Sequence, residues 1–158
     1  MYRNILLAAA LQNWEHYSAH ALAARDVAAT LARHAERLHV LTAYENEPAV
    51  RIPSTVPSDM AAKLREQQVD QTERDVTEKM DDYVGALTSQ GIAVNRLIRI
   101  GSPRHLIIDV AQELEADLIV IGSHSKRGFL DIALGGTAKH VSEHAPCPVV
   151  MVAPKAKK

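Results

Sequence analysis

A glycine-rich loop near the carboxyl terminus is the clearest candidate for a binding site. It follows an apolar run at 117–121, which is rich in β-branched residues and has the length of a strand buried on both faces of a parallel sheet. Gly122 ends this run, and Gly135 and Gly136 precede a stretch of helical periodicity at 137–144. A glycine-bearing loop between a strand and a helix N-terminus presents free backbone N–H groups to a phosphate. The alternative is an ordinary strand-to-helix loop, because isolated glycine patterns are weak signals.

The same loop begins with Ser123, His124 and Ser125, in which two hydroxyls flank an imidazole. Neighbours in sequence need not meet in space. The chain also has no G-x-S-x-G motif with triad partners behind it and no Walker A lysine motif. We therefore predict no catalytic residue and no enzyme, and we keep a nucleotidase or hydrolase only as a third class of function.

Two histidine pairs, His16 with His20 and His140 with His144, have the four-residue spacing that places both imidazoles on one helix face. Zinc sites use this spacing, but solvent-facing histidines are the simpler interpretation, and we expect no metal. The single cysteine, Cys147, cannot form an internal disulfide, which fits a reducing cytoplasm. Its place between two prolines favours a small buried side chain over a redox sensor.

Length and composition indicate one globular domain. The chain has 158 residues, of which 47% are apolar, so it has enough residues for a core. Its 18 basic and 19 acidic residues leave a net charge of −1, which argues against electrostatic binding of nucleic acid. No apolar run approaches the roughly 20 residues of a membrane span, and no signal-peptide cleavage site follows residues 5–10. We expect one cytoplasmic domain over 1–154 and a disordered basic tail at 155–158.

Apolar segments of strand length alternate with segments of helical periodicity along the chain. Strands are expected at 3–9, 38–44, 93–100, 117–123 and 148–153, and helices at 15–35, 59–90, 103–114 and 137–144. This alternation predicts an α/β fold with a parallel sheet and right-handed crossovers. Ligands of such sheets bind beyond the carboxyl ends of the strands, at the topological switch point.

The helix expected at 59–90 has two halves of different character. The first half is nearly all polar, which favours a solvated face over a partner surface. The second half has a stripe of core residues at helical spacing: Val76, Met80, Tyr83, Val84 and Leu87.

Four stretches together resemble the universal stress protein family: 2–7 (YRNILL), 101–103 (GSP), 116–124 (ADLIVIGSH) and 144–150 (HAPCPVV). The resemblance covers almost the whole chain. It implies a Rossmann-like adenine-nucleotide-binding fold, with a five-stranded parallel sheet in the order 3-2-1-4-5 between helices. It also implies a homodimer, in which the last strand, from Pro148 to Val152, pairs across the dimer. An apolar edge strand needs such a partner.

One branch of this family binds ATP through a G-x-x-G-x9-G-[ST] signature. Gly122 and Gly135 match the first and third glycines of the signature. Ser125 occupies the position of the second glycine, and Gly136 occupies the Ser/Thr position, with Thr137 one residue later.

The same branch has an aspartate after the first strand, and Ala10 occupies its position here. The carboxylate that would contact ribose or metal is therefore absent, and the nucleotide pocket departs from the ATP-binding pattern. By resemblance, the ligand would be ATP or AMP, with its adenine against the backbone of Ala43. The residues expected at the pocket are Ala8, Ala10, Ala43, Ile121, Gly122, Ser123, Ser125, Gly135, Gly136 and Thr137.

The main hypothesis is a non-catalytic, cytoplasmic stress-response protein that acts as a dimer through binding. A protein partner is a further candidate, whereas nucleic acid and membrane are not expected. The alternative is a regulatory switch that binds ATP or AMP. A weak nucleotide hydrolase is the third hypothesis.

Overall fold

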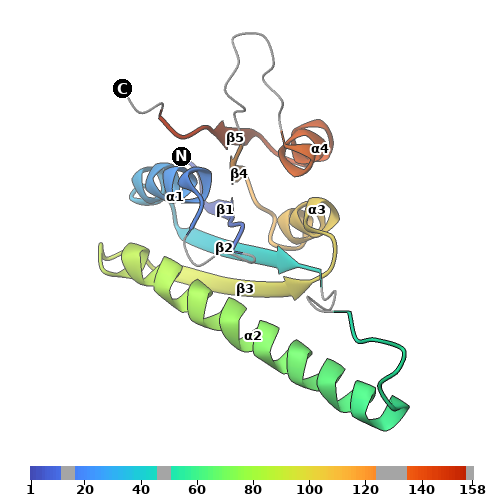
Figure 1. The fold of residues 1–158 in the computed structure, drawn as a ribbon. Helices are drawn as coiled ribbons and strands as arrows, with labels where there is room; N and C mark the ends of the chain where they lie inside the picture. Colours follow the sequence, from blue (N-terminus) through green and yellow to red (C-terminus); the bar gives the residue numbers. More distant parts are fainter. Residues whose placement is uncertain (12–16, 46–50, 124–134, 156–158) are drawn as a thin grey trace.

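The computed structural model describes residues 1–11, 17–45, 51–123 and 135–155. Strands and helices alternate along these ranges (Figure 1). The strands are β1 (Asn4–Ala8), β2 (Arg37–Tyr44), β3 (Val94–Ile100), β4 (Leu118–Gly122) and β5 (Val149–Val152). The helices are α1 (Ala19–Ala32), α2 (Ser58–Thr88), α3 (Pro103–Glu113) and α4 (Gly136–His144).

The five strands form one parallel sheet in the order β3-β2-β1-β4-β5, as predicted. The chain runs outward from β1 to β3 and then returns to place β4 on the other side of β1. Ala8, the last residue of β1, pairs with Leu41 of β2 and Ile121 of β4. The topological switch point, where the expected ligand site lies, is therefore between β1 and β4.

Helices cover both faces of the sheet, α1 and α2 on one face and α3 and α4 on the other (Figure 1). The strands are buried on both faces because successive side chains point in opposite directions. In β1, Ile5 and Leu7 belong to the core beneath α1 and α2, while Leu6 and Ala8 belong to the core beneath α3 and α4. The apolar runs in the sequence thus reflect burial on two sides.

Helix α1 begins later than predicted. The stretch from residue 15 was expected to be helical, but the structure starts the helix at Ala19, and residues 15–16 lie outside the described ranges. Ser18 is the N-cap, and its Oγ accepts a hydrogen bond from the Ala21 N–H at 3.3 Å. A serine cap satisfies one of the free N–H groups of the first turn, which fixes the start of the helix.

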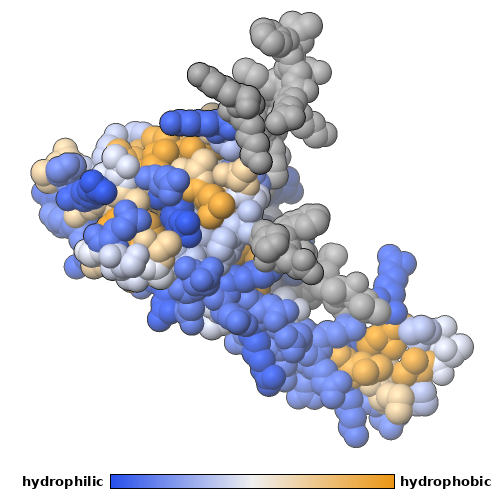
Figure 2. Space-filling view, turned by 60° about the vertical axis from the view of Figure 1, so that its left-hand side comes forward, coloured by the Kyte–Doolittle hydropathy of each residue, from blue (hydrophilic) through white to orange (hydrophobic). Residues whose placement is uncertain are grey.

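Helix α2 extends well beyond the sheet (Figure 1). Its 31 residues span about 46 Å, whereas the seven residues of β3 span about 23 Å. The predicted core stripe is confirmed, since all five of its residues are buried in the second half of the helix. In the first half, Met60 and Leu64 are 55% and 38% exposed. Figure 2 shows hydrophobic surface at the end of α2 that extends beyond the sheet. Among the helices of the described ranges, none is both long and apolar enough to cross a membrane.

Candidate functional site

A cavity of about 350 Å³ lies at the carboxyl ends of β1, β2 and β4, at the switch point of the sheet. The amino-terminal turns of α1, α3 and α4 complete its lining. The lining residues are Ala8, Ala9, Ala10, His20, Ala21, Leu41, Ala43, Pro103, Ile107, Ile121, Gly122, Gly135, Gly136, Thr137 and Ala138. This volume and location are those of a site for a small ligand.

Most of the residues expected at the pocket meet in this cavity. Ser123 does not contribute to its lining; the Ser123 backbone N–H instead donates a hydrogen bond to the Val152 carbonyl of β5 at 2.9 Å. Ser125 lies outside the described residues. The lining includes eight of the ten expected residues: Ala8, Ala10, Ala43, Ile121, Gly122, Gly135, Gly136 and Thr137.

One wall of the cavity is apolar and combines alanines with larger aliphatic side chains. Strands β1 and β2 contribute Ala8, Leu41 and Ala43, while Ile107 of α3 and Ile121 of β4 extend the same surface. Small side chains at the strand ends leave room between the sheet and the helices. A wall of this kind accommodates a flat, weakly polar group such as a nucleobase.

The other wall is formed by helix N-termini. Helix α4 begins at Gly136 directly after Gly135, and no side chain caps its first turn. Among the residues that the structure describes, no atom lies within 4 Å of a Cβ added at Gly136, so none of them fills the space beside this turn. The first N–H groups of a helix have no partner within the helix, and the helix dipole makes this end positive. The arrangement favours an anionic group such as a phosphate.

Gly122 has a packing role that the sequence analysis did not predict. A Cβ at this position would lie 2.7 Å from the His20 carbonyl oxygen and 2.9 Å from His20 Cδ2. Only glycine therefore lets the first turn of α1 approach the end of β4 so closely. This contact places His20 at the cavity.

His20 is the main residue that the sequence analysis missed at this site. The solvent-facing interpretation is wrong for this histidine, because its side chain is buried, with 9% exposure. His16, its expected pair, lies outside the described residues. Among the lining residues that the structure describes, His20 is the only titratable side chain. The available signal was its position in the first helical turn after Ser18, a residue type that favours N-caps.

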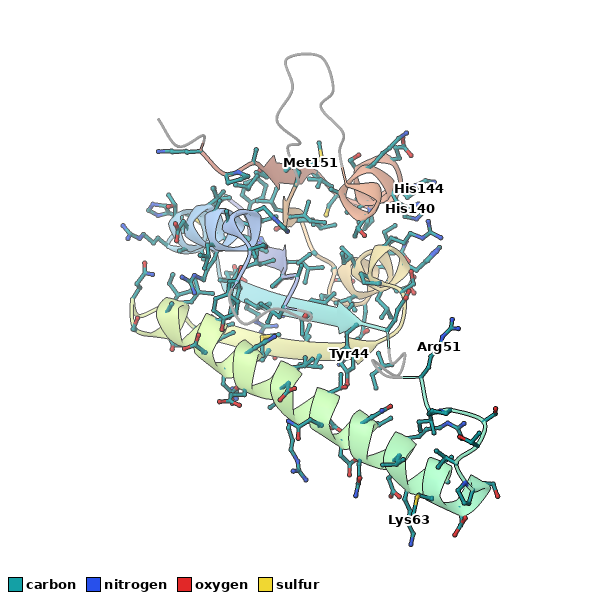
Figure 3. The ribbon with its side chains drawn as sticks, in the orientation of Figure 1. Tyr44, Arg51, Lys63, His140, His144 and Met151 are labelled. Atoms are coloured by element: carbon teal, nitrogen blue, oxygen red, sulfur yellow. The ribbon has the colours of Figure 1, made fainter. Side chains whose placement is uncertain are left out.

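The other histidine pair lies on α4, away from the cavity (Figure 3). The His140 and His144 rings stack with centroids 4.3 Å apart, and His105 of α3 packs 5.1 Å from His140. Partial desolvation, helped by the neighbouring His144 and His105, lowers the pKa of His140. Across residues 1–11, 17–45, 51–123 and 135–155, no group of three or more His, Cys, Asp or Glu side chains has an arrangement that could hold a metal ion.

Cys147 is half-buried and packs against the core beneath α3 and α4. Burial, with a smaller contribution from the charge of Asp117, raises the pKa of its thiol. A thiol in this state is a poor nucleophile, as expected for a packing residue.

The model of the Universal stress protein family matches residues 1–153. Universal stress protein Sll1388 of Synechocystis is 24% identical over 91 residues, which cover 58% of this chain and 59% of that protein. The match to this relative therefore extends over less than two thirds of its length.

Solved structures have the same fold. Universal stress protein UspA from Lactobacillus plantarum superposes with a TM-score of 0.70 at 26% identity, covering 96% of this chain and 97% of that chain. A universal stress protein in complex with cAMP has a TM-score of 0.65 at 17% identity, over 98% and 99% of the two chains. A family protein from Arabidopsis thaliana with AMP bound has a TM-score of 0.60 at 14% identity, over 98% and 93%. At these last two identities the likeness shows the fold alone.

The sequence match and the fold agree. The family model covers nearly the entire chain, and the sheet has the strand order expected for that family. The chain belongs to the universal stress protein family.

Proposed function

We propose that the protein is a non-catalytic, cytoplasmic stress-response protein that binds an adenine nucleotide and acts as a homodimer. One observation supports a nucleotide as the ligand: the lining of the switch-point cavity combines an apolar wall with the first turns of three helices. The wall suits a base, and the helix N-termini suit a phosphate. The AMP and cAMP bound by two proteins of the same fold support this choice of ligand.

The chemistry of the described lining supports binding over catalysis. Nucleotide hydrolysis needs an activated water and stabilisation of the transferred phosphoryl group, usually by a metal ion. Among the described lining residues there is no carboxylate that could hold such a metal or act as a general base. We therefore expect no turnover of ATP above background.

The experiment is a calorimetric titration of nucleotide-stripped protein with AMP, cAMP and ATP–Mg²⁺. We expect low-micromolar binding of at least one nucleotide, about −8 kcal/mol. A Gly136→Leu variant should weaken this binding at least tenfold, because its side chain would enter the space beside the first turn of α4. Gly85→Leu is the matched control, because Gly85 on α2 is equally unobstructed and does not line the cavity.

Two outcomes would change the proposal. If the titration gave no heat of binding at millimolar nucleotide, the protein would instead be a dimeric scaffold that acts through protein partners. If nucleotide bound only after Ala10→Asp and Ser125→Gly were combined, the native pocket would have lost this function.

The homodimer is proposed through the free edge of β5. Its residues are apolar, and Met151 is 39% exposed there (Figure 3). The opposite edge strand, β3, carries Arg96 and Arg99, and charged side chains discourage pairing between sheet edges. The arginines of β3 disfavour pairing at that edge, whereas the apolar residues of β5 favour association at the other.

A further inference from the structure

We infer that Tyr83 of α2 is a positioning residue of the proposed nucleotide site, although it lies outside the cavity. Its hydroxyl holds the first turn of α1, and this turn contributes His20 and Ala21 to the cavity lining. The inference rests on the proposed function and adds a residue on which the affinity of the site depends. That residue belongs to a helix that contributes nothing to the described lining.

The hydrogen bond that joins α2 to this turn is buried. The Tyr83 side chain has 0% exposure, and its hydroxyl donates to the Ala21 carbonyl oxygen at 2.7 Å. A buried hydrogen bond is costly to break, because the groups that lose it stay desolvated. Burial also raises the pKa of Tyr83, which keeps its hydroxyl protonated and able to donate. Helical periodicity predicted Tyr83 as a core residue, and the structure adds this polar contact with the cavity wall.

The aromatic ring of Tyr83 is held in place by two residues from the α1 side. The Tyr17 ring packs edge-on against it, with centroids 5.4 Å apart, and the Arg25 guanidinium lies 5.0 Å from the ring centroid. Arg25 Nη1 also donates a hydrogen bond to the Tyr83 backbone carbonyl at 3.4 Å. The hydroxyl therefore occupies a defined position, as a positioning side chain requires.

A second contact with α2 holds the chain just before α1 begins. The Tyr17 hydroxyl lies 2.8 Å from the Lys79 carbonyl oxygen and 2.7 Å from Asp82 Oδ2. Tyr17 directly precedes Ser18, the N-cap of α1. The first turn of α1 is thus attached to α2 both before its cap, through Tyr17, and after it, through Tyr83.

The opposite side of the same turn lies against β4. An added Cβ at Gly122 would lie 2.7 Å from the His20 carbonyl oxygen, so the turn can come no closer to the strand. The turn is therefore held between β4 and α2. Loss of the Tyr83 hydroxyl gives the turn more freedom on the α2 side, and a bound ligand must then order it at a cost in affinity.

The test uses Tyr83→Phe, which removes the hydroxyl and keeps the buried ring. AMP is titrated into the nucleotide-stripped protein, and hydrogen exchange is measured without ligand. We expect the variant to bind AMP roughly three- to tenfold more weakly, as the loss of one buried hydrogen bond implies. Backbone amides in the first two turns of α1 should exchange faster, because this segment opens more easily. Tyr17→Phe, which removes the neighbouring contact, should change both measurements in the same direction.

Asn4→Ala is the matched control. The Asn4 side-chain amide donates to the Leu114 carbonyl oxygen at 3.3 Å, which also joins distant segments, but Asn4 begins β1 at the end of the sheet opposite the cavity. Urea unfolding shows that each variant is folded and how much stability it has lost. We expect Asn4→Ala to lose stability without a change in AMP affinity or in exchange at the start of α1.

Two results would overturn the positioning role. One is an unchanged AMP affinity in Tyr83→Phe. The other is an equal loss of affinity in Asn4→Ala, which would show that nucleotide binding follows overall stability and not this contact. Both results leave the nucleotide site standing. If the unmodified protein bound no nucleotide, the proposed function would fail, and the exchange measurement would still show whether Tyr83 holds the first turn of α1.

Discussion

At the scale of single residues, a second histidine stands out, at the opposite end of the sheet from the cavity. His39 of β2 is buried, with 5% exposure, and its Nδ1 lies 3.0 Å from the Asn95 side-chain amide of β3. Its Nε2 has no hydrogen-bond partner among the described residues. Burial, with a smaller effect from the charge of Arg37, lowers the pKa of His39. The folded protein therefore favours the neutral imidazole.

This predicts a loss of stability at mildly acidic pH. In the unfolded chain His39 takes up a proton near its ordinary pKa of about 6.5, whereas in the folded chain it does so only at lower pH. Below about pH 6.5 the unfolded state binds more protons, so the free energy of unfolding falls as the pH falls. Urea unfolding at pH 7.5 and pH 5.5 measures the difference. We expect a smaller difference for His39→Asn, which keeps an acceptor for Asn95, and an unchanged one would contradict the assignment.

At the scale of elements, the close contact between the first turn of α1 and the end of β4 determines the shape of the site. The two elements lie far apart in the sequence, and the close approach depends on the missing side chain of Gly122. The obstructing atom is a backbone oxygen of a capped and anchored helix turn, which cannot rotate away as a side chain would. Because protein interiors are closely packed, a single added carbon atom is enough to disturb a contact of this kind.

Gly122→Ala should therefore destabilise the fold by about 1–3 kcal/mol, as an overpacked contact does. Gly85→Ala is the matched control, because a Cβ on this exposed α2 position meets nothing within 4 Å. Replacing a helical glycine with alanine there should raise stability by up to about 1 kcal/mol. Urea unfolding of both variants gives the comparison. Equal stability of the two variants would show that the first turn of α1 can shift to make room.

At the scale of the whole molecule, the two edges of the sheet differ in how well they are protected from pairing with another chain. Edge strands offer unpaired backbone groups to other chains, and proteins protect them with charges or cover them. Strand β3 has arginines, and Arg96 pairs with Asp81 of α2. Strand β5 has only Val and Met residues. The molecule thus has one protected edge and one edge open to a partner.

Met151→Lys should convert the proposed dimer into a monomer, raising the dissociation constant at least tenfold, because it buries a charge in the apolar interface. Light scattering after size-exclusion chromatography measures the mass of each species. Ile100→Lys is the matched control: Ile100 is 59% exposed at the end of β3, on the other edge, and its replacement should leave the dimer intact. A monomeric unmodified protein, or a dimer lost only in Ile100→Lys, would contradict association through β5.

The sequence by itself determined the α/β class, and the family resemblance added the strand order and eight of the residues that line the cavity. The α/β class could be predicted because apolar runs and helical periodicity are local features of a sequence. Apolar runs such as 117–121 show burial on two sides, and Gly135 with Gly136 marks the start of α4. The stripe in the second half of α2 was likewise visible as helical periodicity.

Only the tertiary structure decided which side chains meet. The four-residue spacing predicts His20 as one member of a surface pair, and the fold places it at the cavity against Gly122. It paired His140 with His144, and the fold adds His105 from another helix. These contacts join segments that are distant in the chain, and they depend on the angle and depth at which each helix packs on the sheet. Periodicity reports which face of a helix is buried, but it does not report what that face will touch.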